Sequence, residues 1–170
     1  MGERPFSALA KVYRIAGRYV KRRAVRICDV PLRVREKPFW LKVFNRRAAV
    51  ALLGTVYLPG GFRARHEGTA RFDDVLDHES IHVARQHAAG MLRWHLLYAL
   101  SRRFRWEEEK AAYRSELRRL RARGEDLAPE ARERLAAELA GAKYLYMTDA
   151  ATARAFIDEA LREPAPPPAI

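Results

Sequence analysis

Two histidines and a glutamate stand at a spacing that suits a metal site. His78, Glu79 and His82 form the pattern H-E-x-x-H. On a helix, four residues advance the chain by about 400°, so both imidazoles lie on one face and can converge on one ion. Glu79 then lies beside the ion rather than on it. Zn²⁺ lowers the pKa of water to roughly 7, and Glu79 can take that proton while the hydroxide attacks a polarised carbonyl.

A catalytic zinc ion needs a third protein ligand, and the motif itself does not supply one. In the extended pattern H-E-x-x-H-x-x-G-x-x-H a third histidine completes the site, but Arg85 and Ala88 occupy its glycine and last histidine positions here. His87 lies about 140° round the helix from His82, so it cannot bind the same ion. The third ligand must therefore be a carboxylate from a later segment.

Three consecutive glutamates after Trp106 are candidates for that ligand. Helical phase places Glu109 on the apolar face, together with Tyr113. Glu107 and Glu108 fall on flanks rich in arginine, where solvated ion pairs explain them. We therefore choose Glu109 as the third ligand, and the alternative is that all three glutamates only pair with arginines.

The elements that must position these side chains are mostly helical. The motif belongs to a predicted helix over residues 73–89, an amphipathic helix is expected over 6–22, and the last helix is expected over 151–162. Four or five helices fit between residue 71 and the end of the last one. Between them we expect breaks at Gly90, around Arg105, at 124–129 and near 141–148.

The first third of the chain carries the strand signals. Alternating apolar residues predict one or two short strands within 25–34, near a sheet edge, and residues 50–58 read as one strand that ends at a Pro-Gly-Gly turn. Residues 39–47 are ambiguous, and the proline-rich tail at 164–170 is expected to be polyproline. The predicted fold is α+β, mostly α, with a small N-terminal sheet followed by a helical bundle, in a single domain over 1–163.

Composition excludes several classes of protein. A chain of 170 residues with 49% hydrophobic and 32% charged residues is not disordered, and no apolar run approaches the length of a membrane span. One cysteine excludes an intrachain disulfide. Basic residues interrupt every apolar stretch near the N-terminus, so we expect no signal peptide and a cytoplasmic protein.

The net charge of +12 would normally suggest nucleic acid or an anionic membrane as a partner. Most of the basic residues are arginine in a chain rich in alanine, a bias that a GC-rich genome imposes on any protein. Basic clusters at 102–105 and 118–123 lie near glutamates, which favours solvated helix faces. Nucleic acid is therefore a possible but not a favoured partner, and the oligomeric state is not indicated.

One region of the chain resembles a known family. Its features are the strand 50–58 ahead of the motif, the continuation of H-E-x-x-H by Val83 and Gln86, and the later Glu109 with Tyr113 four residues on. With these features residues 50–117 resemble the zincin-type metallopeptidases with a glutamate third ligand, called gluzincins. They look most like small bacterial and phage proteins in which the motif continues into valine and glutamine.

The resemblance implies a zincin-like fold, a peptide or protein substrate and one zinc ion. It implies these roles: zinc ligands His78, His82 and Glu109, and general base Glu79. It also implies that strand 50–58 offers its backbone to an extended substrate, with Val56 and Tyr57 as the substrate-binding residues.

Tyr113 marks a departure from that family. Well-studied gluzincins often carry an aspartate at this position to orient a zinc ligand, whereas a phenol can donate a hydrogen bond to a carboxylate or an oxyanion. We therefore count Tyr113 among the catalytic candidates, and His87, His95 and Tyr98 are other possible oxyanion donors.

Two classes of function follow from these residues. The first is a zinc-dependent metallopeptidase that hydrolyses peptide bonds through an activated water. The alternative is a non-catalytic binding or structural protein, possibly of phage origin, that contains zinc and has a basic surface for nucleic acid or anionic partners.

Overall fold

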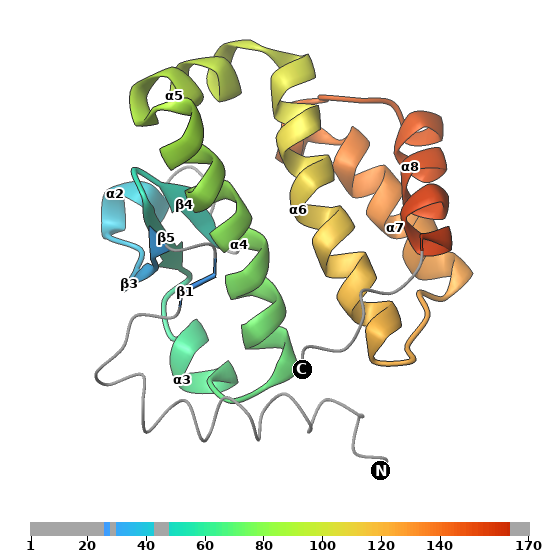
Figure 1. Cartoon of the computed structure of the whole chain (residues 1–170), viewed down its shortest axis with the longest axis horizontal. Coiled ribbons are helices and arrows are strands. Elements are labelled where there is room, and N and C mark those ends of the chain that lie inside the picture. The colour runs from blue at the N-terminus through green and yellow to red at the C-terminus, as the bar shows by residue number, and fades with distance from the viewer. Residues whose placement is uncertain (1–25, 28–29, 43–47, 164–170) are drawn as a thin grey trace. The chain divides into compact units, whose positions relative to one another are not determined.

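The computed structural model describes residues 26–27, 30–42 and 48–163. The chain divides into two compact units, residues 1–91 and 92–170. A small sheet comes first and helices follow it, which confirms the predicted mostly helical α+β architecture (Figure 1). The helix predicted over 6–22 and the proline-rich tail lie outside the described residues.

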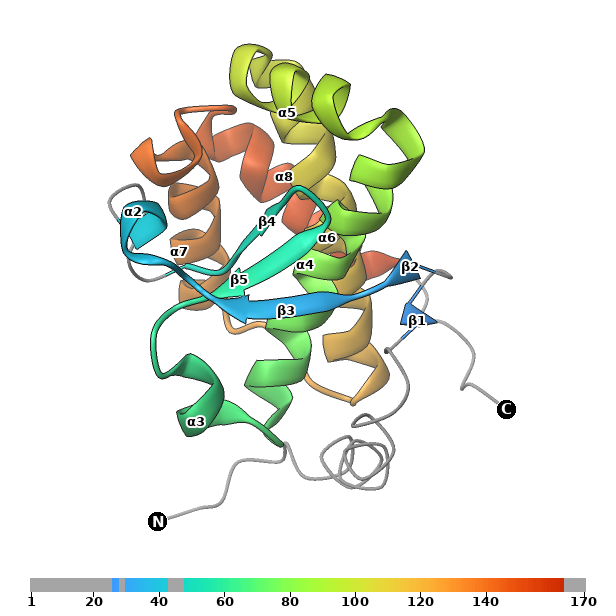
Figure 2. The same ribbon diagram turned by 90° about the vertical axis from the view of Figure 1, so that its left-hand side faces the viewer.

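The first unit contains two small sheets. Strands β1 (Arg26–Ile27) and β2 (Val30–Pro31) pair antiparallel, which confirms the strands expected within 25–34. The second sheet has the order β3-β5-β4 (Figure 2). Its central strand β5 (Thr55–Leu58) runs parallel to β3 (Arg33–Glu36) and antiparallel to β4 (Val50–Leu52).

The single strand predicted over 50–58 is wrong, because the chain reverses at Leu53 and Gly54. Both residues have positive φ, 49° and 70°. Two consecutive positive φ values are typical of a type I′ turn, whose twist suits a two-residue hairpin. The segment is therefore a β4–β5 hairpin.

The helices of the first unit are α2 (Phe39–Lys42), α3 (Phe62–His66) and α4 (Ala70–Ala89). The side chain of Thr69 caps α4 by accepting a hydrogen bond from the backbone of Phe72, so the helix starts three residues before the predicted Asp73. Helix α4 contacts both strands of the hairpin. The buried residues of this core are Ala51, Val56, Leu58, Phe62, Phe72, Leu76 and Val83.

All regular secondary structure among the described residues of the second unit is helical. Its elements are α5 (Met91–Leu100), α6 (Arg102–Ala122), α7 (Pro129–Ala140), the 3₁₀ helix η1 (Ala142–Tyr144) and α8 (Ala150–Arg162). Helix α8 packs against α6 and α7 (Figure 1). The buried residues of this core include Leu117, Leu139, Phe156 and Ile157. None of the helices built from described residues is long and apolar enough to cross a bilayer.

The break predicted around Arg105 is wrong. The chain breaks at Ser101 instead, where the serine side chain caps α6 by accepting from the backbone of Phe104 at 3.2 Å. Arg105 lies inside α6, and its guanidinium donates to the carbonyl oxygens of Tyr98 and Ala99. A basic side chain therefore satisfies the end of α5.

Candidate metal site

The motif residues lie in the middle of α4. The rings of His78 and His82 stand one turn apart on the same face, with centroids 5.2 Å apart. His82 is buried, His78 is half-buried, and Glu79 is 8% exposed. One buried and one half-buried imidazole next to a buried carboxylate form the donor arrangement that the H-E-x-x-H spacing predicts.

Gln86, one turn after His82, ties α4 to the β4–β5 hairpin. Its side chain is fully buried, its Oε1 accepts from the backbone of Gly54 at 2.9 Å, and its Nε2 donates to the carbonyl of Ala51 at 3.0 Å. A Cβ at Gly54 would lie 3.1 Å from Nε2 of His87, and the positive φ also favours glycine there. The position of the motif helix is therefore set by backbone groups of the hairpin.

Lys37 is a charged residue near the motif that the sequence analysis missed. Its side chain is 3% exposed, and its backbone N–H donates to the carbonyl of Leu58 at 2.8 Å at the end of the sheet. Burial lowers the pKa of Lys37, and attraction to the Glu79 carboxylate opposes that shift. No local pattern marks this lysine, because its proximity to Glu79 arises from the tertiary fold.

Strand β5, which carries the predicted substrate-binding residues Val56 and Tyr57, cannot accept another strand. Val56 pairs with Val34 on one side and Ala51 on the other, and Tyr57 likewise has partners in both β3 and β4. Addition of an extended peptide needs a strand with a free edge. The predicted strand addition at Val56 and Tyr57 is therefore wrong, because β5 is the central strand of its sheet.

In the second unit, Glu109 lies on α6 and is 2% exposed. The hydroxyl of Tyr98 donates to its Oε1 at 2.5 Å. A hydrogen bond of this kind fixes the orientation of a carboxylate, as partners of metal ligands do. Helix α6 therefore presents an oriented carboxylate at the position that helical phase favours.

Tyr113 lies one turn beyond Glu109 and is also buried. Its hydroxyl is 2.7 Å from the hydroxyl of Tyr144, a residue of η1 that the sequence analysis missed. Burial raises the pKa of both phenols well above 10.0, and the negative charge of Glu109 adds to the rise for each. Both tyrosines are therefore protonated at neutral pH and can act as hydrogen-bond donors.

The three neighbouring glutamates have different surroundings. Glu107 is exposed and forms an ion pair with Lys110 at 2.9 Å, as expected for a solvated flank. Glu108 is 2% exposed and accepts from Nε1 of Trp94 at 2.9 Å, so its predicted place on a solvated flank is wrong. The reason is tertiary: Trp94 of α5 covers that flank of α6.

The remaining oxyanion candidates are less suited to the role. His87 is exposed on α4, and the ring of His95 packs edge-on against Trp94 with centroids 5.1 Å apart. Tyr98 already donates its hydroxyl hydrogen to Glu109. Tyr113 therefore stays the preferred candidate, together with Tyr144.

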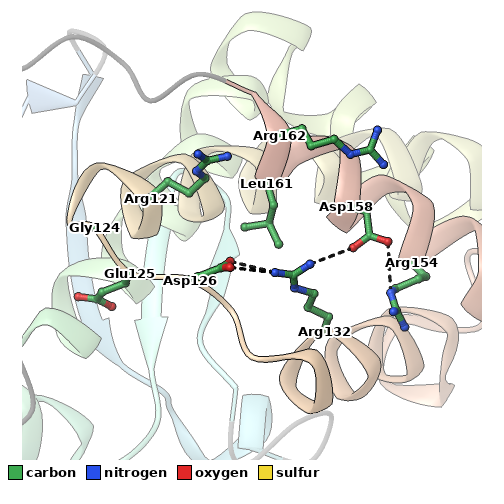
Figure 3. Close-up of a pocket in the computed structure, with 9 residues that line it drawn as sticks. All are labelled: Arg121, Gly124, Glu125, Asp126, Arg132, Arg154, Asp158, Leu161 and Arg162. Carbon is green, nitrogen blue, oxygen red and sulfur yellow. Dashed lines mark hydrogen bonds and ion pairs between the residues drawn. The ribbon is translucent and has the colours of Figure 1, made fainter.

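A cavity of about 580 Å³ in the second unit is lined by several arginines, which could bind a phosphate group (Figure 3). Arg132 pairs with Asp126 at 3.0 Å and with Asp158 at 3.5 Å. Arg154 also pairs with Asp158, at 3.3 Å. Two of the arginines that line the cavity are therefore already paired with acidic residues.

The donor atoms define the chemistry open to these side chains. Imidazoles and a carboxylate are ligand types that suit Zn²⁺, and Glu79 is a further carboxylate that can accept a proton. No family model matches the chain, and searches among curated proteins and solved structures find no similar protein.

Proposed function

We propose that His78, His82 and Glu109 hold one zinc ion and that the protein is a zinc-dependent metallopeptidase of the zincin type. The observation that carries the proposal is that one potential ligand atom from each of these side chains lies within 4.8 Å of the others. Ligands at about 2.1 Å from a tetrahedral zinc ion stand roughly 3.4 Å apart, so small side-chain movements suffice. Two histidines and one glutamate also leave a position open for a catalytic water.

The ion, when bound, would polarise a peptide carbonyl and lower the pKa of water to about 7. Glu79 adjoins a ligand on the same helix and accepts the proton of the attacking water, then delivers it to the leaving amine. Lys37 lies near this carboxylate, and the two opposite charges attract each other. Tyr113, paired with Tyr144, is the proposed donor to the oxyanion that forms on the carbonyl.

Metal content tests the ligand set directly. We expect about one equivalent of zinc in protein purified without a metal-affinity tag, and little in His82→Ala or Glu109→Gln, because each change removes a ligand. Glu107→Gln is the matched control: it alters an exposed glutamate of the same helix and should keep the zinc. Glu108→Gln should also keep it, since the amide oxygen can still accept from Trp94.

Two outcomes would contradict this assignment. Less than about half an equivalent in the wild type would argue against a resident zinc ion. Equal loss in all three glutamate variants would mean that the charge of the segment matters and not the position of Glu109.

A further inference from the structure

Helix α5 presents an apolar stripe to solvent. Leu92, Leu96 and Leu100 are 74%, 52% and 82% exposed. Their spacing of four places them along one face of the helix. On another face Trp94 is 3% exposed and bonded to Glu108, so the helix is anchored there. Single exposed leucines are ordinary, but three aligned on a ten-residue helix indicate an interaction surface.

The end of this stripe is held in place by the corner between α5 and α6. Arg105 is 5% exposed, and its guanidinium donates to the carbonyl oxygens of Tyr98 and Ala99, the last of these at 3.2 Å. Ser101 caps the following helix. Leu100 is therefore displayed by a hydrogen-bonded corner and not by a frayed helix end.

Basic side chains flank the leucines. Arg93, Arg102 and Arg103 are exposed, and none of their side chains has a hydrogen bond or an ion pair with another residue in the described part of the chain. Residues 91–105 contain no acidic residue at all. The surface thus combines an apolar stripe with uncompensated positive charge, which is the pattern of helices that lie in the interface of an anionic bilayer.

We propose that α5 and the α5–α6 corner dock on an anionic membrane surface. The leucines enter the headgroup region while the arginines reach lipid phosphates, and a helix about 15 Å long lies in the plane of the membrane. A second copy of the chain fits this surface poorly, because a symmetric contact would bring arginines together with no acidic partner. The proposal is independent of the metal site, because it uses none of the proposed ligands.

Vesicle sedimentation tests the proposal. We expect the full chain to bind phosphatidylcholine vesicles that contain phosphatidylglycerol and not pure phosphatidylcholine vesicles, and to bind less as salt is added. Leu96→Gln with Leu100→Gln should reduce partitioning roughly tenfold or more, because the apolar insertion is lost. Arg102→Glu with Arg103→Glu should reduce it by at least about 25-fold, since each basic residue near the surface contributes about fivefold.

Matched controls separate this surface from general charge and apolarity. Arg121→Glu with Arg162→Glu changes the net charge by the same amount at the cavity of Figure 3 and should bind more tightly than the corner variant. Leu145→Gln alters a leucine that is 61% exposed elsewhere in the second unit and should bind as the wild type does. Circular dichroism and thermal unfolding verify that each variant is folded.

Three results would overturn the proposal. The first is that the wild-type protein stays in the supernatant when the anionic vesicles sediment. The second is that the leucine variant binds as well as the wild type, and the third is that the two arginine double variants lose binding equally. Light scattering identifies the competing occupant: a wild-type dimer that Leu96→Gln dissociates, without vesicle binding, would assign the stripe to a second copy.

Discussion

Helices α4 and α6 both carry proposed zinc ligands, but they are held in different ways. In α4, Gln86 bonds to backbone groups of Gly54 and Ala51, so the helix is attached to the path of a hairpin. In α6, Glu108 and Glu109 bond to side chains of α5, through Trp94 and Tyr98 respectively. A backbone partner exists in any sequence that forms the hairpin, whereas a side-chain partner depends on two particular aromatic residues.

Substitutions at the contacts that hold α4 and α6 should therefore have different effects. Changes at the anchor of α4 should affect the stability of the first unit, because they leave buried backbone groups without partners. Changes at the partners of α6 should affect the orientation of a carboxylate more than the fold, because the buried core of the second unit lies along Leu117, Leu139 and Ile157.

Glu79→Gln should have the largest effect on function and should leave both anchors intact. The amide has nearly the same shape as the carboxylate but cannot accept the proton of the attacking water, so cleavage of labelled denatured casein should fall by about 10²- to 10⁴-fold. Zinc content and circular dichroism should match the wild type. Cleavage by this variant at the wild-type rate would exclude the proposed mechanism, and a zinc-loaded wild type that cleaves no peptide would favour the non-catalytic alternative.

Gln86→Leu should cause the largest loss of stability in the first unit. It leaves the N–H of Gly54 and the carbonyl of Ala51 without their side-chain partner, and each such buried group costs about 1–3 kcal/mol. We expect the free energy of unfolding, measured in urea, to fall by about 2–4 kcal/mol. Arg71→Leu, an exposed change on the same helix, should stay within about 0.5 kcal/mol of the wild type. An unchanged free energy for Gln86→Leu would mean that the hairpin does not anchor α4.

Tyr98→Phe should act on zinc affinity and not on the fold. It removes the hydroxyl that donates to Glu109, and loss of such a partner weakens metal binding by about 10- to 100-fold. Competition with a chromophoric chelator measures the affinity. Tyr146→Phe, a tyrosine that is 62% exposed, is the matched control. If Tyr98→Phe binds zinc as tightly as the control, the hydrogen bond does not orient a ligand.

The same contrast explains which elements the sequence could predict. The helices follow from apolar periodicity, and the last one differs by a single residue from its prediction over 151–162. The hairpin was missed because its turn is Leu53-Gly54, and only the structure shows that a leucine adopts positive φ there. The break near Arg105 was misplaced because its side chain turns back to the carbonyls of α5, a contact that spacing along one helix cannot reveal.

For the candidate site, local residues could be predicted and tertiary partners could not. His78, Glu79 and His82 lie within five consecutive positions, and helical phase correctly places Glu109 on the buried face of α6. The burial of Glu108 depends on Trp94 from another helix, so phase alone misplaced it. Nothing near Lys37 in the sequence indicates its proximity to Glu79.

The helix caps of the two units should differ in how their contribution to stability depends on pH. Helix α4 begins at Thr69, a neutral cap, whereas α8 begins at Asp149, whose carboxylate accepts from the backbone of Thr152 at 2.8 Å. Hydrogen bonds from the backbone and the hydroxyl of Thr152 hold the pKa of Asp149 below its ordinary value of 3.8. A carboxyl whose pKa is lower in the folded state stabilises the fold above the unfolded pKa, and this stabilisation is lost as the pH falls through the folded value.

Asp149→Ala should therefore lower the melting temperature at pH 7, and its difference from the wild type should shrink in acid well below pH 3.8, as the wild-type cap becomes protonated as well. Asp149→Asn keeps a side-chain acceptor, so it should lose less at pH 7 and show little change in that loss with pH. Thr69→Ala is the control in the first unit: its deficit should stay the same across this range, because a hydroxyl does not titrate there. Thermal unfolding followed by circular dichroism measures all four proteins. A deficit in Asp149→Ala that is equally large at both pH values would mean that the charge of the cap contributes nothing, and the two units would then begin their helices by the same uncharged hydrogen bond.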